Sequence, residues 1–185
     1  MEPDESNRKA THQPEIDLPG VTRIGKPTAT WEQSTHAPDA MRWLKNICLE
    51  FKPGEGLMCL FSGAHGPAQT LAAQAIAKQL GKPLMHVDLA MVVGNYIGET
   101  EKNLNGIFDA AQRQDAVLFF DEADALFGKR TEVKDSHDRF ANVAIDDLLQ
   151  RIESFQGLVI LASNRKSAQD SALMRRLRLV IDFPP

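Results

Sequence analysis

Long apolar runs, abundant cysteines and an excess of basic charge are all absent from this 185-residue sequence. Its apolar runs fall well short of the roughly 18 residues that a membrane span requires, and its acidic, polar N-terminus is unlike a secretory signal, so we expect no membrane partner. Cys48 and Cys59 lie in apolar surroundings, and their spacing is not that of a disulfide or a metal-binding pair. This predicts buried, reduced thiols in a cytoplasmic protein. A net charge of -4 argues against nucleic acid as a partner.

The composition that remains is sufficient for one folded domain. Hydrophobic residues make up 43% of the chain, enough to fill a core. Residues 1–30 are different, because they hold charges, four prolines and few large apolar groups. We predict a flexible N-terminal arm over 1–30 and a core domain over 31–185, with order beginning near Trp31. The arm is either a tail without function or a docking peptide.

Short apolar runs alternate with helical patterns along the core domain. Runs without a polar break are typical of strands buried on both faces of a parallel sheet. Helices are predicted from Pro38, after Thr70, over 99–113 and from Asp135 or Ser136. The pattern predicts a three-layer α/β fold with a parallel sheet of about five strands flanked by helices. The predicted strands are 57–61, 84–88, 116–120, 158–164 and 179–183.

The third predicted strand ends abruptly in two acids, Asp121 and Glu122. Ligands of open parallel sheets bind at the carboxyl ends of the strands. An apolar run closed by Asp-Glu is typical of a Walker B element, in which the Asp holds Mg²⁺ and the Glu polarises the attacking water. The alternative is a buried strand that ends in solvated acids.

A glycine-containing loop joins the first predicted strand to a helix, which is the context of a phosphate-binding loop. In the pattern G-x-x-x-x-G-K-[ST], Gly63 holds the first position and Thr70 the last. Ala68 stands in place of the second glycine, and Gln69 stands in place of the lysine.

These two substitutions weaken the expected phosphate site. Gln69 donates hydrogen bonds without a charge, and a charge-assisted bond is about twice as strong as a neutral one. Ala68 adds a methyl where backbone must approach the phosphates. The helix N-terminus still attracts an anion, and Thr70 is placed to reach Mg²⁺, so we expect residual binding of ATP or ADP with Mg²⁺ and impaired hydrolysis. The candidate nucleotide-binding residues are Gly63, His65, Gly66, Ala68, Gln69, Thr70 and Leu71, with Thr70 and Asp121 as the metal-side residues.

Two further segments carry a family resemblance. Residues 96–104 (YIGETEKNL) and 119–130 (FFDEADALFGKR) resemble the AAA branch of the AAA+ ATPases, and the resemblance covers about 56–185. It implies the P-loop NTPase fold, with Asp121 on the Mg²⁺ side and Glu122 as catalytic base. It also implies that Tyr96, Ile97 and Gly98 form a pore loop that grips a polypeptide. The alternative is a tyrosine packed under a loop.

The same resemblance assigns roles near the end of the chain. It places Asn164 at the sensor 1 position, where an amide orients the hydrolytic water, although an Asn at this point can simply begin a turn. It implies that Arg175 and Arg178 reach the γ-phosphate of a neighbouring subunit, although Arg176-Leu177 replaces the usual Pro-Gly between them. AAA proteins usually continue into a helical lid, which we expect to be absent here, since the sequence ends at Pro185.

These features give a first hypothesis and two alternatives. The first is a degenerate AAA module, a weakly or non-hydrolysing structural or regulatory subunit that works with other AAA subunits in a homo- or hetero-oligomer. The second is an active ATPase that remodels a polypeptide client, with Gln69 a tolerated variant. The third is a decayed gene product. The first is favoured because the motifs that act across an interface are kept, while the phosphate loop is eroded.

Overall fold

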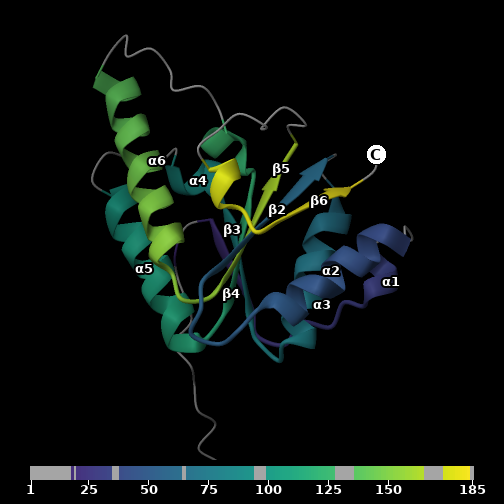
Figure 1. The fold of residues 1–185 in the computed structure, drawn as a ribbon. Coiled ribbons are helices and arrows are strands. Elements are labelled where there is room, and N and C mark those ends of the chain that lie inside the picture. The colour runs from purple at the N-terminus through teal and green to yellow at the C-terminus, as the bar shows by residue number, and fades with distance from the viewer. Residues whose placement is uncertain are drawn as a thin grey trace, which may run out of the picture.

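The computed structural model describes residue 18 and residues 20–34, 38–63, 66–93, 99–127, 136–164 and 173–183. A six-stranded sheet lies between helices on both faces (Figure 1), which confirms the predicted three-layer α/β fold. The strands are β1 (Val21–Ile24), β2 (Leu57–Gly63), β3 (Leu84–Asp88), β4 (Val117–Asp121), β5 (Leu158–Ser163) and β6 (Leu179–Phe183).

The order of the strands across the sheet is β1-β3-β4-β5-β2-β6. Strands β3, β4, β5, β2 and β6 are parallel to one another, which confirms the five predicted strands. β2 is longer than predicted, because it continues to Gly63, which lies opposite Phe183 of β6. In the order of the sheet, β5 lies between β4 and β2.

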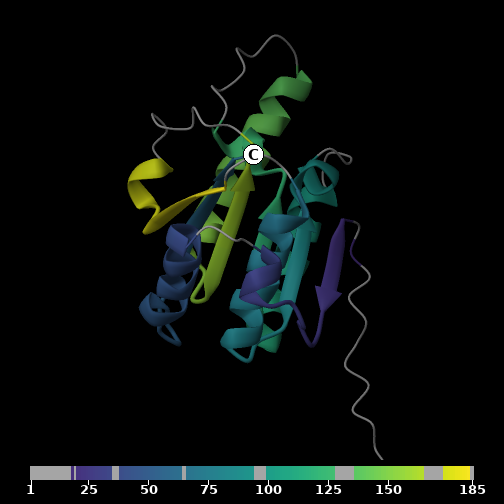
Figure 2. The ribbon, with the colours of Figure 1, turned by 90° about the vertical axis from the view of Figure 1, so that its right-hand side faces the viewer.

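The prediction of a flexible arm over 1–30 is wrong for its last part. Val21–Ile24 forms β1, which pairs antiparallel with β3 at one edge of the sheet (Figure 2). The carbonyl of Gly20 accepts a hydrogen bond of 2.8 Å from the backbone N–H of Asp88. Composition averaged over thirty residues hid this strand, because only four residues with two half-buried side chains are needed to cover the edge.

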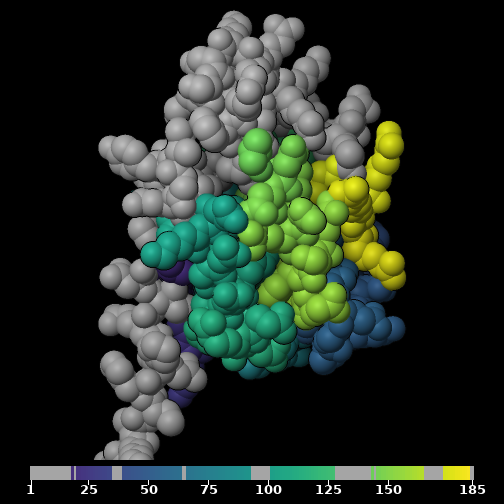
Figure 3. All heavy atoms as spheres, turned by 90° about the vertical axis from the view of Figure 1, so that its left-hand side faces the viewer, coloured from purple at the N-terminus to yellow at the C-terminus, as the bar shows by residue number. Residues whose placement is uncertain are grey.

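Helices cover the two faces of the sheet. Figure 3 shows α5 and α6 side by side over one face, and the views in Figures 1 and 2 place α1, α2 and α3 on the other. The α-helices are α1 (Trp31–Ser34), α2 (Pro38–Glu50), α3 (Pro67–Gln79), α4 (Leu89–Val93), α5 (Glu99–Gln114) and α6 (Ser136–Ser154), and the short 3-10 helices are η1 (Ala123–Phe127) and η3 (Met174–Arg176).

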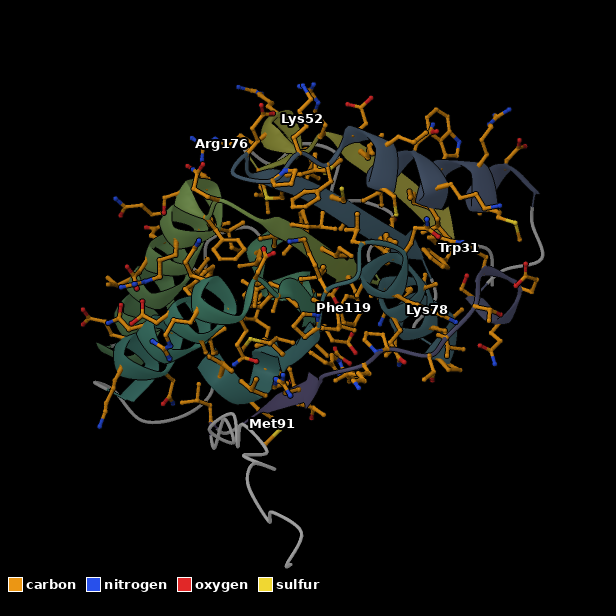
Figure 4. All side chains as sticks on the ribbon, turned by 90° about the horizontal axis from the view of Figure 1, so that it is seen from below. Trp31, Lys52, Lys78, Met91, Phe119 and Arg176 are labelled. Carbon is orange, nitrogen blue, oxygen red and sulfur yellow. The ribbon has the colours of Figure 1, made fainter. Side chains whose placement is uncertain are left out.

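Two apolar clusters, one on each face of the sheet, form the core. Successive side chains of a strand point to opposite faces, so Phe119 of β4 packs with α2 and α3, while Phe120 packs with α5 and α6. Both rings are fully buried, and Figure 4 places Phe119 in the interior. Burial of each such ring stabilises the fold by about 1.5–3 kcal/mol. The continuous apolar run of β4 is thereby explained.

A short helix follows β3 directly. Residues 89–93 form α4. Leu89 and Val92, three positions apart, are buried on its inner face, and this pairing holds the short helix against the core. In the part of the chain that the structure describes, no helix is long and apolar enough to cross a bilayer.

The docking of β1 predicts a measurable difference between two glycine substitutions. Gly20 and Gly54 have φ of +76° and +82°, so alanine at either site is strained by about 1–2 kcal/mol. A Cβ at Gly20 would also lie 2.9 Å from Met91 Cβ and 3.2 Å from the Asp88 carbonyl oxygen, whereas one at Gly54 would meet nothing within 4 Å. We expect Gly20→Ala to lower the free energy of unfolding by about 1–3 kcal/mol more than Gly54→Ala does, measured by urea denaturation. Equal losses would mean that the N-terminal segment does not pack as described.

The two cysteines predict slow reaction with thiol reagents. Burial raises the pKa of Cys48 to about 11, and burial with the nearby Cys48 raises the pKa of Cys59 to about 12. At pH 8 the thiolate fraction is then about 0.1% or less, against about a quarter for an exposed thiol. We expect labelling by a disulfide reagent to be at least about 100-fold slower in the folded protein than in urea. A Cys48→Ser variant reports on Cys59 alone, and fast labelling of that variant while folded would contradict its burial.

Candidate functional site

Three parallel strands bring the predicted catalytic segments to one edge of the sheet. β4 ends at Asp121, β5 ends one residue before Asn164, and β2 ends at Gly63, where the phosphate loop begins. Because β5 pairs with both β4 and β2 in parallel register, the three carboxyl ends lie next to one another. Figure 1 shows the arrowheads of β2 and β5 directed to the same end of the molecule.

The first glycine of the loop is required by a neighbouring strand. Gly63 has φ of +130°, and a Cβ at this position would lie 2.2 Å from the carbonyl oxygen of Phe183 in β6. No side chain fits there, whatever the loop binds. Gly66, directly before α3, has an extended backbone with φ of 177°, and a Cβ there would meet nothing within 4 Å. His65 lies outside the described residues.

The first turn of α3 holds the two positions that depart from the phosphate-loop pattern. Pro67 begins the helix, where its missing N–H is no loss. Gln69 lies on the buried stripe of α3 with Ala72, Ala73 and Ile76, and it is only 2% exposed. Both its amide nitrogen and its amide oxygen lack a hydrogen-bond partner in the described structure. An unpaired buried polar group destabilises a fold by about 1–3 kcal/mol. Packing alone therefore does not explain why an amide stands at this position.

Ala68, Thr70 and Leu71 are half-buried in the same turn of α3. Ala68 packs against the apolar cluster of the α2–α3 face. The candidate nucleotide-binding residues 66 and 68–71 are therefore contiguous with the carboxyl end of β2, as the sequence predicts. Since this turn is the N-terminus of a 13-residue helix, its free backbone N–H groups favour an anion.

Asp121 has a basic neighbour that the sequence analysis did not identify. Nε2 of His86 on β3 lies 3.1 Å from Oδ2 of Asp121. The register explains the contact, because His86 lies opposite Phe119 and the next side chain on that face of β4 is Asp121. The His86 and Phe119 rings are 5.2 Å apart between centroids. The sequence alone did not indicate this contact, because it depends on how β3 pairs with β4.

The backbone turns sharply at the end of β4. Glu122 has φ of +56°, in the left-handed region that non-glycine residues seldom occupy. Its N–H donates a 2.9 Å hydrogen bond to Oδ1 of Asp121, and its side chain is exposed. Such backbone strain persists where the surrounding structure imposes it, and it is common at functional sites.

Asp124 joins the ends of two strands and was also not identified from the sequence. The hydroxyl of the fully buried Ser163 donates a 2.8 Å hydrogen bond to Oδ1 of Asp124. The backbone N–H of Asn164 lies 3.5 Å from the other carboxylate oxygen. The residue after β5 is therefore tied to η1, which follows β4. Asp124 acts here as a brace that fixes the backbone at Asn164.

The donor set at this edge fits one kind of cation. Within the described ranges, no group of three or more His, Cys, Asp or Glu side chains gathers as a metal centre. Mg²⁺ needs no such cage, because it is held by one or two carboxylates together with water and phosphate oxygens. Asp121, about a quarter exposed, and the hydroxyl of Thr70 are the groups that fit this role.

One of the two predicted arginines, Arg178, lies toward the amino end of the sheet. Arg178 comes directly before β6, and its N–H donates to the carbonyl of Met58 near the start of β2 (3.0 Å). Its guanidinium lies 3.8 Å from the Glu50 carboxylate, while the exposed Arg176 pairs with Glu153. Arg175 is exposed on η3. The fold therefore places Arg178 away from the chain's own phosphate loop, which follows the carboxyl end of β2.

Arg176 and Arg178 border a cleft of about 440 Å³ that is lined by apolar side chains and by charged ones at its rim. Figure 4 shows Lys52 and Arg176 along the same side of the molecule. The lining residues are Glu50, Lys52, Glu55, Gly56, Leu57, Met58, Ile152, Glu153, Arg176 and Arg178. The rim carries charges of both signs, so the cleft does not select an acidic or a basic ligand.

The predicted pore-loop residues Tyr96, Ile97 and Gly98 lie outside the described residues, as does the mixed-charge segment 129–135. The elements on either side of 94–98 are described. α4 ends at Val93 and α5 begins at Glu99.

Comparison with known proteins agrees with this geometry. A model of the family described as "ATPase family associated with various cellular activities (AAA)" matches residues 59–185. An AAA family ATPase of Sinorhizobium fredii, y4kL, is 38% identical over 126 residues, covering 67% of this chain and 38% of the relative. A probable 26S proteasome regulatory subunit 10B of Caenorhabditis elegans is 36% identical over 126 residues, covering 65% and 31%. The chain thus spans about a third of the length of these relatives.

Solved structures show the same fold. The FIGL-1 AAA domain in complex with ADP superposes with a TM-score of 0.69 at 22% identity, covering 88% of this chain and 59% of that chain. A second crystal structure of the FIGL-1 AAA domain gives a TM-score of 0.70 at 20% identity. The strand-loop-helix at 57–79, the acids after β4 and the family match over 59–185 all agree. The chain therefore belongs to the AAA family of ATPases.

Proposed function

We propose that this chain is an AAA ATPase core with an eroded phosphate loop, which acts as a weakly or non-hydrolysing structural or regulatory subunit. The observation that carries the proposal is Gln69. Its side chain is buried in the first turn of α3 and offers a neutral amide where the phosphate-loop pattern has a lysine. A neutral donor gives less stabilisation to the charge that develops during phosphoryl transfer.

The other residues of the edge fit nucleotide binding. The N–H groups at the start of α3 would bind phosphate oxygens, and Asp121 with Thr70 would hold Mg²⁺, which neutralises phosphate charge when bound. Glu122 would act as the base toward water, and the amide of Asn164 would orient that water. Asp124 keeps the Asn164 backbone in place through its contacts with Ser163 and with the N–H of Asn164.

The proposed partners are other AAA subunits. Arg178 lies at the end of the sheet opposite the chain's own phosphate loop, and Arg175 is exposed on η3, which supports a role for both arginines toward a neighbour rather than toward this site. One relative is named as a regulatory subunit of the 26S proteasome, which supports work within an assembly. Contact of Tyr96, Ile97 and Gly98 with a polypeptide client in the cytoplasm is part of the same proposal.

An active, polypeptide-remodelling ATPase is the second candidate. The observation that favours it is the acidic edge itself, since Asp121, Glu122 and Asn164 all follow neighbouring strand ends. The strained backbone at Glu122 is also expected of a residue kept for chemistry. The two candidates differ in one point: whether the Gln69 amide can perform the role of the lysine in binding and hydrolysis.

A titration with Mg²⁺ and a fluorescent ATP analogue tests the proposal. We expect the double variant Ala68→Gly, Gln69→Lys to bind at least about tenfold more tightly than the natural chain, because it restores a charge-assisted contact. We also expect ATP hydrolysis to appear in the double variant and to be lost again when Glu122→Gln is added.

A matched control removes the effect of added charge. The variant Ala68→Gly, Gln79→Lys carries the same net charge, but its lysine lies at the exposed C-terminal end of α3. It should bind the analogue clearly more weakly than the repaired variant, because its lysine cannot reach the phosphates. If the natural chain binds as tightly as the repaired variant and hydrolyses ATP at a comparable rate, the second candidate replaces the first.

A further inference from the structure

Within the described residues, Gln69 is the one residue with buried side-chain polar atoms that have no hydrogen-bond partner, namely the nitrogen and the oxygen of its amide. It is a donor and an acceptor at once, and both functions are unmet. It also lies in the first turn of a 13-residue helix, whose N–H groups attract anions independently of this side chain. Two separate features of the same turn thus indicate a ligand that carries hydrogen-bonding oxygens.

The position of Gln69 puts its side chain at the phosphate-loop end of α3. Gln69 shares the sheet-facing stripe of α3 with Ala72, Ala73 and Ile76. Side chains of a helix lean toward its N-terminus, and this N-terminus follows the end of β2. The amide therefore belongs to the edge where β4 and β5 also end.

The charge at this edge limits which ligand is favoured. Asp121, Glu122 and Asp124 place three carboxylates within four residues, at the end of β4 and the start of η1. Mg²⁺ held at Asp121 would neutralise part of the charge of a ligand, and the other two carboxylates repel the charge that remains. A lysine at position 69 would offset one such charge, whereas the Gln69 amide offsets none.

We propose that this edge is a site for a nucleoside diphosphate rather than a triphosphate, and that the Gln69 amide makes the selection. The inference rests on the proposed function and names its ligand. A diphosphate carries less charge into the acidic edge, and its terminal oxygens accept from Gln69 Nε2. The Oε1 atom is left to accept from a water molecule, which a lysine cannot do. The chain would then hold a diphosphate without a catalytic cycle.

Competition binding in the presence of Mg²⁺ tests this selection. ADP and a non-hydrolysable ATP analogue are titrated separately against the natural chain and the single variant Gln69→Lys. We expect ADP to bind the natural chain at least as tightly as the ATP analogue. In the lysine variant the ratio of the two dissociation constants should move toward the ATP analogue by about tenfold.

A second variant supplies a readout that does not depend on activity. Gln69→Met has similar length and no unpaired polar atom, so the ligand-free protein should melt roughly 2–4 °C higher. The same variant should bind ADP about tenfold more weakly, because the amide contact is gone. A residue that only fills space would raise the melting temperature without weakening ADP binding.

The outcomes separate this inference from the proposed function. If the natural chain binds neither nucleotide while the repaired double variant binds ATP, the inference is overturned and the proposed function stands. If the natural chain prefers the ATP analogue tenfold over ADP, or if Gln69→Met leaves ADP binding unchanged, the inference is also overturned. Robust hydrolysis by the natural chain would overturn both.

Discussion

The burial of parallel strands on both faces is the constraint on which the rest of the structure depends. Such strands need helices on either side, and the connections between them place every carboxyl end at the same edge. With β5 lying between β4 and β2, the acids after β4, the amide after β5 and the loop after β2 meet without any contact designed for that purpose. The site is a product of strand order, and the core that enforces this order consists of side chains such as Phe61, Phe119 and Phe120.

The same order also divides the molecule into two ends with different chemistry. One end carries carboxylates and a helix N-terminus, and the other carries Arg176 and Arg178 around a cleft of about 440 Å³. β2 connects them, since its first residues line the cleft and its last residue begins the phosphate loop. Under the proposed function, such a subunit lacks a charged side chain at position 69 of its own phosphate loop and presents basic groups elsewhere. This polarity is the physical reason for preferring a subunit that works with neighbours.

Local patterns predicted the parallel strands and the family motifs, because unbroken apolar runs and helical stripes are encoded within a few consecutive residues. The N-terminal strand was not predicted, since two apolar residues, Val21 and Ile24, do not form a recognisable strand pattern within a polar segment. His86 and Asp124 escaped for another reason: their contacts with Asp121 and Ser163 depend on which strands become neighbours. The substitution at Gln69 was visible in the sequence, but the burial of its unpaired amide was not, because burial belongs to the assembled fold.

The left-handed backbone at Glu122 has a consequence for engineering. Glycine adopts φ of +56° without strain, so a screen for thermal stability alone would favour a glycine there and discard the carboxylate. Stability and the proposed chemistry are thus opposed at a single position at the end of a buried strand. Selection of stabler variants of this domain would therefore remove the Glu122 carboxylate, the group proposed as the base toward water, while the free energy of unfolding increased.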